Sequence, residues 1–237
     1  MYSLIFFLIQ LISISGFNIP PNIINPLLSG SQLATAKISK NIVENLNLNS
    51  NTTRKIIHIA SAPAFISTWG LYNDNHNPEL WASSVPIVTS LYLINKKDEL
   101  SSLISRSGNS TELFKGPLIY TSVLSILTLT NWKDPIGMIA LLQLSIGDGF
   151  ADVIGRKYGK TKWFHNNKKS VEGTIGYFIT SLIGTNLVIN NYYHFDFNFE
   201  KIIIFSLISS LVETFSEIDD NISIPLSIFI LDKILKI

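Results

Sequence analysis

Cysteine is absent from this 237-residue chain, and charged side chains are scarce. The lack of cysteine excludes disulfides and thiolate metal sites. Only 15% of the residues are Asp, Glu, Lys or Arg, whereas a soluble domain usually carries about 25%. The formal net charge of +1 gives no electrostatic reason to bind bulk nucleic acid. We therefore expect no nucleic-acid partner, and the sequence points to no protein partner.

Long apolar stretches recur along the chain. Seven of them are predicted helices, at 56–72, 80–95, 117–131, 135–155, 173–191, 201–214 and 222–237. Most are near the roughly 17–25 residues that cross a bilayer as a helix, and 117–131 lacks the charged stripe of a soluble surface helix. We predict an all-α fold, a polytopic membrane helix bundle of about seven transmembrane helices after a cleavable leader, with the lipid bilayer as a partner. A soluble all-α core is the alternative.

The first 53 residues have the composition of a leader. Residues 1–16 look like a signal segment, because a short apolar run is followed by small residues. Residues 17–53 are serine-containing and weakly basic, with no acidic residue before Glu44, which is typical of an organellar transit segment and linker. We predict a two-part plastid leader, a membrane domain at 54–237 and a location in a plastid (chloroplast) membrane. A plain anchor or an endoplasmic-reticulum signal, with that membrane as the location, is the alternative.

Charge is concentrated between the apolar stretches. If each predicted helix crosses the membrane, Arg54 and the segments 96–116, 156–172 and 215–221 all share one face, because two crossings separate each from the next. The basic residues in these segments predict that this face is cytoplasmic or stromal. Nucleotides occur on that side, so the predicted sidedness agrees with nucleotide chemistry.

The strongest local signal lies at 147–160, where Asp148 and Asp152 are four residues apart. On a helix both carboxylates project from the same face. Ionisable residues in a membrane segment are costly and indicate function, and Mg²⁺ prefers one or two carboxylates together with phosphate oxygens and water. We predict that Asp148 and Asp152 bind Mg²⁺. A buried pair that a neighbouring span satisfies is the alternative.

A basic run without acidic residues follows the aspartates at 156–169. Its lysines can bind a polyphosphate, nearby glycines allow close backbone approach, and the amides of a helix that opens at Gly173 can bind phosphate. The predicted nucleotide-binding residues are Gly149, Gly155, Arg156, Gly159, Lys160, Lys168, Lys169 and Gly173. For the basic run alone, a topology signal or contact with anionic lipid is the alternative.

Two further groups occur on the predicted nucleotide face. The acidic group comprises Glu213, Glu217, Asp219, Asp220 and Asn221. It can supply a further metal ligand or accept the proton of a substrate hydroxyl; a solvated turn that caps the last helix is the alternative. Arg54 and His58 are four apart on the first predicted span, and we expect contact with phosphate or a substrate headgroup. A packed, hydrogen-bonded histidine is the alternative.

Together these residues resemble the polyprenol kinase family, which includes phytol, farnesol and dolichol kinases. The matching blocks begin at Arg54, Ser105, Gly147, Lys168 and Asp219. The block at Ser105 and the last block look most like plant phytol kinases. Departures at 107, 110 and 214–216 concern substrate preference more than reaction class.

The resemblance implies a kinase that transfers the terminal phosphoryl group of CTP, or alternatively of UTP or ATP, to an isoprenoid alcohol. Phytol is the expected alcohol, and phytyl monophosphate for tocopherol synthesis and phytol salvage is the expected product. The expected catalytic residues are Asp148, Asp152, Glu172, Asp219 and Asp220. The expected contacts to substrate or phosphate are Arg54, His58, Arg106, Asn109 and Asn221.

Other functions stand as alternatives. A farnesol or dolichol kinase would use the same chemistry on another alcohol. A CTP-dependent phosphatidate cytidylyltransferase, which makes CDP-diacylglycerol, has a similar aspartate and Lys-Lys block, but the C-terminal Gly-Asp-Leu-Phe-Glu-Ser run expected of it is absent here. A non-catalytic membrane protein or transporter would need no ordered acidic and basic blocks on one face.

Overall fold

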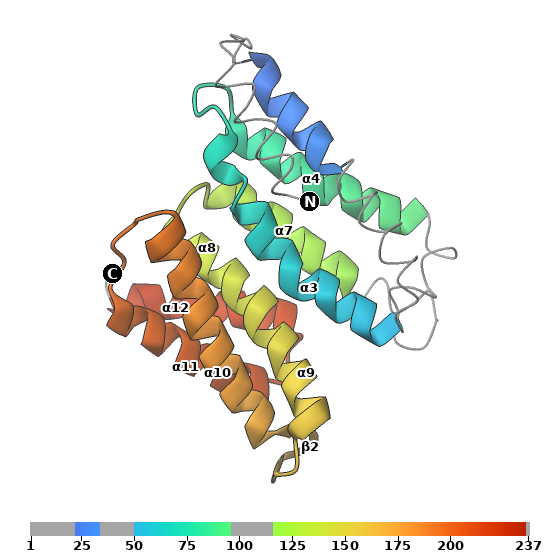
Figure 1. The fold of residues 1–237 in the computed structure, drawn as a ribbon, viewed down its shortest axis with the longest axis vertical. Helices are drawn as coiled ribbons and strands as arrows, with labels where there is room; N and C mark the ends of the chain where they lie inside the picture. Colours follow the sequence, from blue (N-terminus) through green and yellow to red (C-terminus); the bar gives the residue numbers. More distant parts are fainter. Residues whose placement is uncertain (1–21, 34–49, 96–115, 236–237) are drawn as a thin grey trace. The chain divides into compact units, whose positions relative to one another are not determined.

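The computed structural model describes residues 22–33, 50–95 and 116–235. Most of these residues are helical, which confirms the predicted all-α class (Figure 1). A short antiparallel hairpin interrupts the helices within the described part of the chain. The signal segment predicted at 1–16, and the contacts predicted for Arg106 and Asn109, lie outside the described residues.

The chain divides into two compact units, one of Met1–Thr53 with Thr68–Trp132 and one of Arg54–Ser67 with Lys133–Ile237. The described elements of the first are a helix at 22–33, η1 (Trp69–Leu71), α4 (Pro78–Asn95), α7 (Pro117–Thr130) and the start of α3 (Ser50–Ile66). The second holds the rest of α3, α8 (Pro135–Leu142), η2 (Gln143–Gly147), α9 (Asp148–Tyr158), β1 (Lys162–Trp163), β2 (Asn166–Ser170), α10 (Val171–Asn186), η3 (Leu187–Tyr192), α11 (Phe199–Phe215) and α12 (Asp220–Leu235).

The first unit is held together by aromatic rings and hydroxyls. The ring centroids of Trp69 and Trp132 are 4.9 Å apart. Ser29, on the helix at 22–33, donates a hydrogen bond of 2.6 Å to the backbone carbonyl of Trp81. Part of the segment predicted to be a transit sequence and linker therefore packs within this unit. All of the described site candidates lie in the second unit.

The second unit is built around a continuous rod, α8–η2–α9. Pro135 occupies the first turn and Asp134 caps it by accepting the amide proton of Gly137 at 3.1 Å, as expected for a helix start. Within the described residues, this rod of 24 residues is the one helix long and apolar enough to cross a membrane, and most of it is buried inside the protein. A buried core helix meets the same test, so the rod alone does not show a membrane protein.

A π-helical segment lies inside this rod. The residues of η2 are all buried, and they immediately precede Asp148. Gln143 donates through Nε2 to Ser206 on α11 at 2.8 Å and to Thr185 on α10 at 3.3 Å. Single π turns inside α-helices often occur at functional sites. Here the π turn shifts the helix register just before the first aspartate.

Helices occur at all seven predicted stretches, with shifted ends. The first prediction, 56–72, divides into α3, which starts earlier at Ser50, and the separate 3₁₀ turn η1. The fifth, 173–191, continues as the π-helical η3 to Tyr192. The others differ from their predictions by up to three residues at the ends that the structure describes.

The predicted basic loop folds into the hairpin β1–β2, which the sequence did not predict. Trp163 donates through Nε1 to Thr174 on α10 at 3.0 Å. The ring of His165 stacks on Phe215 of α11 at a centroid distance of 4.4 Å. These contacts hold the hairpin against α10 and α11. Its strand β2 therefore has a defined direction where α9 ends and α10 begins (Figure 1).

Candidate active site

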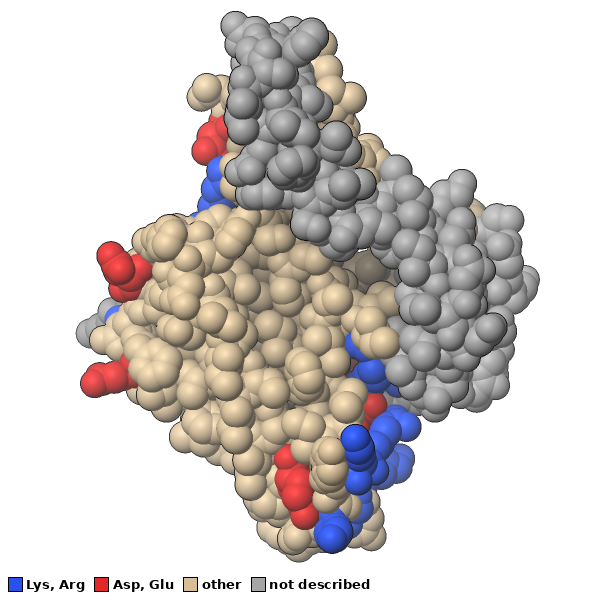
Figure 2. Space-filling view, in the orientation of Figure 1, with Lys and Arg blue, Asp and Glu red and all other residues tan. Residues whose placement is uncertain are grey.

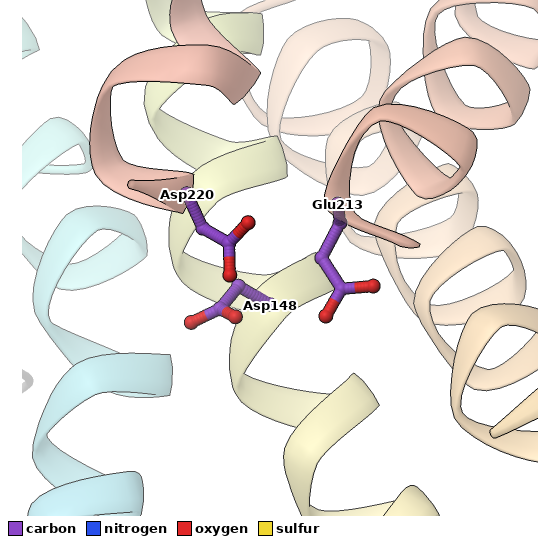
Figure 3. A group of neighbouring side chains, drawn as sticks. All are labelled: Asp148, Glu213 and Asp220. Atoms are coloured by element: carbon purple, nitrogen blue, oxygen red, sulfur yellow. The ribbon is translucent and has the colours of Figure 1, made fainter. Parts of the chain in front are cut away.

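Three carboxylates from three helices meet at one point. Asp148 opens α9, Glu213 lies in the last turn of α11 and Asp220 opens α12. One oxygen of each lies within 4.8 Å of one oxygen of the other two. Figure 3 shows the three side chains pointing toward one another. We call them the carboxylate cluster.

Lys169 on β2 reaches the cluster. Its Nζ donates to Glu213 Oε1 at 2.5 Å, to the Glu213 carbonyl at 2.7 Å and to Asp220 Oδ2 at 3.1 Å. Lys168, the preceding residue, is exposed. Successive side chains on a strand point to opposite faces, which is why the two lysines do not act side by side. The strand thus brings one of the two predicted phosphate-binding lysines to the carboxylates.

Charge at the cluster is not balanced by this lysine alone. Burial disfavours the ammonium of Lys169, but Glu213 and Asp220 outweigh burial and raise the pKa of Lys169. Burial raises the pKa of Asp220 to about 6, with Lys169 acting in the opposite direction and Asp148 adding to the rise. The two carboxylates thus favour the ammonium of Lys169, whereas burial first and then Asp148 disfavour the charged form of Asp220. A divalent cation among the carboxylates would favour their charged forms.

Helix α3 supplies a lysine and a histidine on the other side of Asp148. His58 Nε2 lies 3.1 Å from Asp148 Oδ2 and 3.2 Å from the Leu144 carbonyl. Since both neighbours are acceptors, this nitrogen carries a proton that it donates. Lys55 Nζ lies 4.0 Å from Asp148 Oδ2 and 3.3 Å from Asp152 Oδ2. The predicted contact residue His58 therefore lies at the site.

The two predicted metal ligands have different surroundings. Asp148 belongs to the carboxylate cluster, whereas Asp152 pairs with Lys55 and accepts from Arg156 Nε at 2.9 Å. Arg156 is half exposed and engaged by Asp152. The structure joins Asp148 to Glu213 and Asp220 and leaves Asp152 with basic partners.

Glu172 is engaged by backbone amides. It accepts the N–H groups of Lys160 and Thr161, at 3.2 and 3.0 Å. The backbone amide of Glu172 itself makes the largest contribution to lowering the pKa of this carboxyl group. The amides of Thr161 and Lys160 lower it further. In this structure Glu172 ties the start of the hairpin to the first turn of α10. Lys160 itself is exposed.

The predicted phosphate glycines lie at close contacts between helices. A Cβ on Gly173 would lie 3.0 Å from the Ala151 carbonyl and 3.3 Å from Gly155 Cα, so α9 and α10 touch through these two glycines. A Cβ on Gly149 would overlap Ile59 Cγ1 of α3, and one on Gly159 would overlap the Gly155 carbonyl. Gly155 and Gly173 thus allow close approach between helix backbones, whereas Gly149 faces a side chain of α3 and Gly159 faces the end of its own helix.

The remaining candidates are Asp219 and Asn221, at the start of α12, and Arg54 on α3. Asp219 is exposed, and its Oδ1 accepts the backbone amide of Asn221 at 3.0 Å and the side-chain amide at 2.8 Å. Asp219 rather than Asp220 or Asn221 therefore makes the helix-capping contact, which leaves Asp220 turned to the cluster. Arg54 is half-buried near the start of α3.

Two residues at the site were not singled out from the sequence. Lys55 directly follows the predicted contact residue Arg54, and Glu213 was expected only as a member of the acidic group. For Glu213 a signal exists, because it is an acidic residue at the end of an apolar stretch. For Lys55 the signal is its spacing of three from His58, which puts both on one helix face.

The cluster fits a hard divalent cation. Three carboxylates that converge within 4.8 Å are the oxygen donors that Mg²⁺ takes in proteins, and it keeps further positions for water and phosphate. Tyr177, which is fully buried and has no hydrogen-bond partner for its hydroxyl within the described residues, adjoins the cluster. The site therefore has donors for a cation and an unsatisfied polar group beside them.

Comparisons with known proteins agree with this chemistry. The model of the cytidylyltransferase family matches residues 23–218. The chain is similar to a probable chloroplastic phytol kinase of Triticum aestivum, with 32% identity over 78% of this chain and 68% of the relative. It is also similar to phytol kinase 1 of Arabidopsis thaliana, with 31% identity over 76% of this chain and 65% of the relative, and to the chloroplastic farnesol kinase of that plant, with 31% over 73% and 62%. No solved structure matches.

Proposed function

The chain belongs to the cytidylyltransferase family, together with the phytol and farnesol kinases that it resembles, and from this premise we propose that it is a membrane kinase for an isoprenoid alcohol. The donor is a nucleoside triphosphate, with CTP expected before UTP or ATP. The acceptor is phytol, and the product is phytyl monophosphate. A chloroplastic location of the relatives supports a plastid membrane for this chain.

The convergence of the carboxylate cluster with Lys169, Lys55 and His58 carries this proposal. Phosphoryl transfer needs little covalent help, because positioning and neutralisation of charge supply most of the rate enhancement. A site for it must hold a metal ion, phosphate oxygens and an alcohol oxygen together. In the described part of the chain, the acidic and basic groups that such a site needs lie together in one place.

Each group has a proposed role. Asp148, Glu213 and Asp220 would hold Mg²⁺, which supplies neutralisation of phosphate charge when bound. Lys169 and Lys55 would bind phosphate oxygens, and His58 orients Asp148. In the transfer, the alcohol oxygen forms a bond to the terminal phosphorus as the bond from that phosphorus to its bridging oxygen breaks. The nucleoside diphosphate leaves, and a carboxylate of the cluster takes the hydroxyl proton.

The distribution of polarity in the second unit supports a bilayer. Large apolar residues lie exposed at helical spacing on the outer faces of α10, α11 and α12: Ile175, Ile179 and Ile183; Ile204, Leu207 and Leu211; Ile222, Leu226, Ile230 and Ile234. Buried inside are the polar residues Gln143, Ser181, Thr185, Ser206 and Ser209. Water would favour the opposite arrangement, whereas lipid favours small polar residues between helices.

Charged side chains gather where the hairpin lies. In Figure 2, basic and acidic side chains lie together at the end of the second unit that carries β2, while the helical surface beside them is almost free of charge on this face. This supports a nucleotide site at a membrane surface. A signal segment at 1–16 is part of the same proposal, whereas the helix at 22–33, inside the predicted transit segment, packs within the first unit.

The test uses the full chain, purified in detergent and supplied with phytol, farnesol, geranylgeraniol or dolichol, with each triphosphate and Mg²⁺. We expect phytyl monophosphate and CDP by mass spectrometry, and loss of product when EDTA removes the metal. The family name also covers cytidylyltransferases, so phosphatidate is included as a substrate. Release of pyrophosphate with CDP-diacylglycerol, and no alcohol monophosphate, would contradict the kinase proposal.

A further inference from the structure

Two buried hydroxyls beside the carboxylate cluster have no role in the chemistry described so far. Tyr177 on α10 and Ser209 on α11 are each 0% exposed. Within the described part of the chain, neither hydroxyl oxygen has a hydrogen-bond partner. They lie within reach of each other on the adjacent helices α10 and α11. Buried hydroxyls in folded proteins are nearly always satisfied, so such a pair calls for a ligand group or water.

Their position relative to the cluster is defined by the helices. Ser209 is four residues before Glu213 on α11, so its side chain lies on the same face one turn further into the unit. The ring of Tyr177 lies against Gly147, where an added Cβ would be 2.5 Å from Cζ. Gly147 directly precedes Asp148, and Tyr177 interacts electrostatically with both Asp148 and Glu213. The pair therefore borders the cluster on its interior side.

The chemistry of the pair selects the kind of ligand. Each hydroxyl can donate and accept a hydrogen bond, so a third hydroxyl between them would satisfy both. A phosphate would need cations, and Lys169 and Lys55 approach the cluster from β2 and α3 instead. An alcohol with a long apolar tail must enter among apolar residues, because water excludes its tail.

We infer that Tyr177 and Ser209 form the subsite for the hydroxyl of the acceptor alcohol. This inference rests on the proposed kinase function and adds the residues that position the acceptor. Both are positioning residues: they hold the alcohol oxygen beside the cluster, where the terminal phosphoryl group would be bound. The ligand class is a primary alcohol with an apolar chain.

The experiment compares Tyr177→Phe and Ser209→Ala with two matched controls in the full chain. Ser181→Ala lies on α10 one turn from Tyr177, and Ser210→Ala lies beside Ser209 on α11. Their hydroxyls already donate to the Phe178 carbonyl at 3.2 Å and the Leu207 carbonyl at 2.7 Å. The controls remove buried hydroxyls of the same helices that are already satisfied.

We expect each test variant to raise the KM for phytol about tenfold, the usual effect of losing one neutral hydrogen bond. The KM for CTP, the Mg²⁺ midpoint and kcat should stay within about twofold, and so should all constants of the controls. In the double variant, the KM for phytol should rise by less than the product of the two single increases, because both hydroxyls contact one group. The Tm of Tyr177→Phe should not fall, since the hydroxyl it loses is unpartnered.

The outcomes separate the two proposals. If the wild-type chain phosphorylates phytol and both variants keep its KM for phytol, the pair binds only water and the subsite is overturned while the kinase function stands. If the wild-type chain phosphorylates no alcohol with any triphosphate, the proposed function fails, and the subsite fails with it. Should Tyr177→Phe not fold, Ser209→Ala decides alone.

Discussion

At the residue scale, Asp148 connects the two halves of the site. Its carboxylate faces Glu213 and Asp220 on one side and His58 and Lys55 on the other. A change at this carboxylate therefore affects both metal binding and the cationic side. Substitution by asparagine keeps the shape and removes the charge.

For Asp148→Asn we expect alcohol phosphorylation to fall about a thousandfold or more, because a metal ion supplies several kcal/mol of charge stabilisation. The protein should still insert and elute as a folded species. Turnover at saturating phytol and CTP is the measurement. Glu200→Gln, at the exposed opposite end of α11, is the control and should be fully active. Activity within tenfold of wild type in Asp148→Asn would rule out the cluster.

Lys169 occupies the place of a cation between two carboxylates of the cluster. For Lys169→Met we expect Mn²⁺ to bind about tenfold more tightly without nucleotide, since no ammonium competes with the metal. Turnover should fall, because a phosphate contact is lost. Electron paramagnetic resonance of Mn²⁺ measures the affinity.

The same variant should have a lower Tm without metal, because the buried Glu213 and the partly buried Asp220 lose their partner. Added Mg²⁺ should then raise its Tm by more than it raises that of wild type. Lys168→Met, on the exposed face of β2, is the matched control. Equal Mn²⁺ affinity in wild type and Lys169→Met would show that this lysine does not compete for the metal position.

At the element scale, the contact between α3 and α9 determines whether Lys55 and His58 reach Asp148. Gly149 faces Ile59, and a Cβ there would overlap Ile59 Cγ1. His58 and Lys55 lie on the same helix as Ile59. The glycine thus positions the α3 side chains.

For Gly149→Ala we expect α3 to be displaced, with a loss of about 1–3 kcal/mol of stability from overpacking and a fall in turnover. Ile59→Ala alone should cost about 2 kcal/mol or more. Combined with Gly149→Ala, it should restore part of the activity, because it removes the Cγ1 atom that the added methyl group would overlap. Thermal unfolding and turnover of the four-member cycle are the measurements. If the second substitution restores nothing, then Gly149 is needed for another reason, such as the predicted phosphate contact.

At the scale of the whole molecule, the absence of cysteine makes single-cysteine labelling a direct test of membrane insertion. Phe164 is 91% exposed on the hairpin, and Ile179 is 47% exposed on α10. In membranes, we expect a water-soluble maleimide to label Phe164→Cys at least about tenfold faster than Ile179→Cys, since a thiol in apolar surroundings does not ionise. Both should label after detergent denaturation. Similar rates in intact membranes would contradict a lipid-facing α10.

Much of the fold follows from local properties of the chain. The helices occur where apolar stretches of helical length predicted them. This is because the burial of an apolar face depends on residue type and period. The hairpin was missed because Trp163 and His165 acquire their partners on α10 and α11 only in the folded chain. The π turn before Asp148 likewise depends on contacts of Gln143 with two other helices.

The sequence by itself determined the helical class and the family resemblance, and it named Asp148, Lys169 and Asp220 as site candidates, because residue type and order carry that information. Only the tertiary structure decided which carboxylates meet. Glu213 lies 65 residues from Asp148 in the chain and joins it through the packing of α11 on the rod, whereas Asp152, one turn away, is held by Arg156 and Lys55. Spacing along one helix defines a shared face, but convergence of separate helices depends on how their side chains pack.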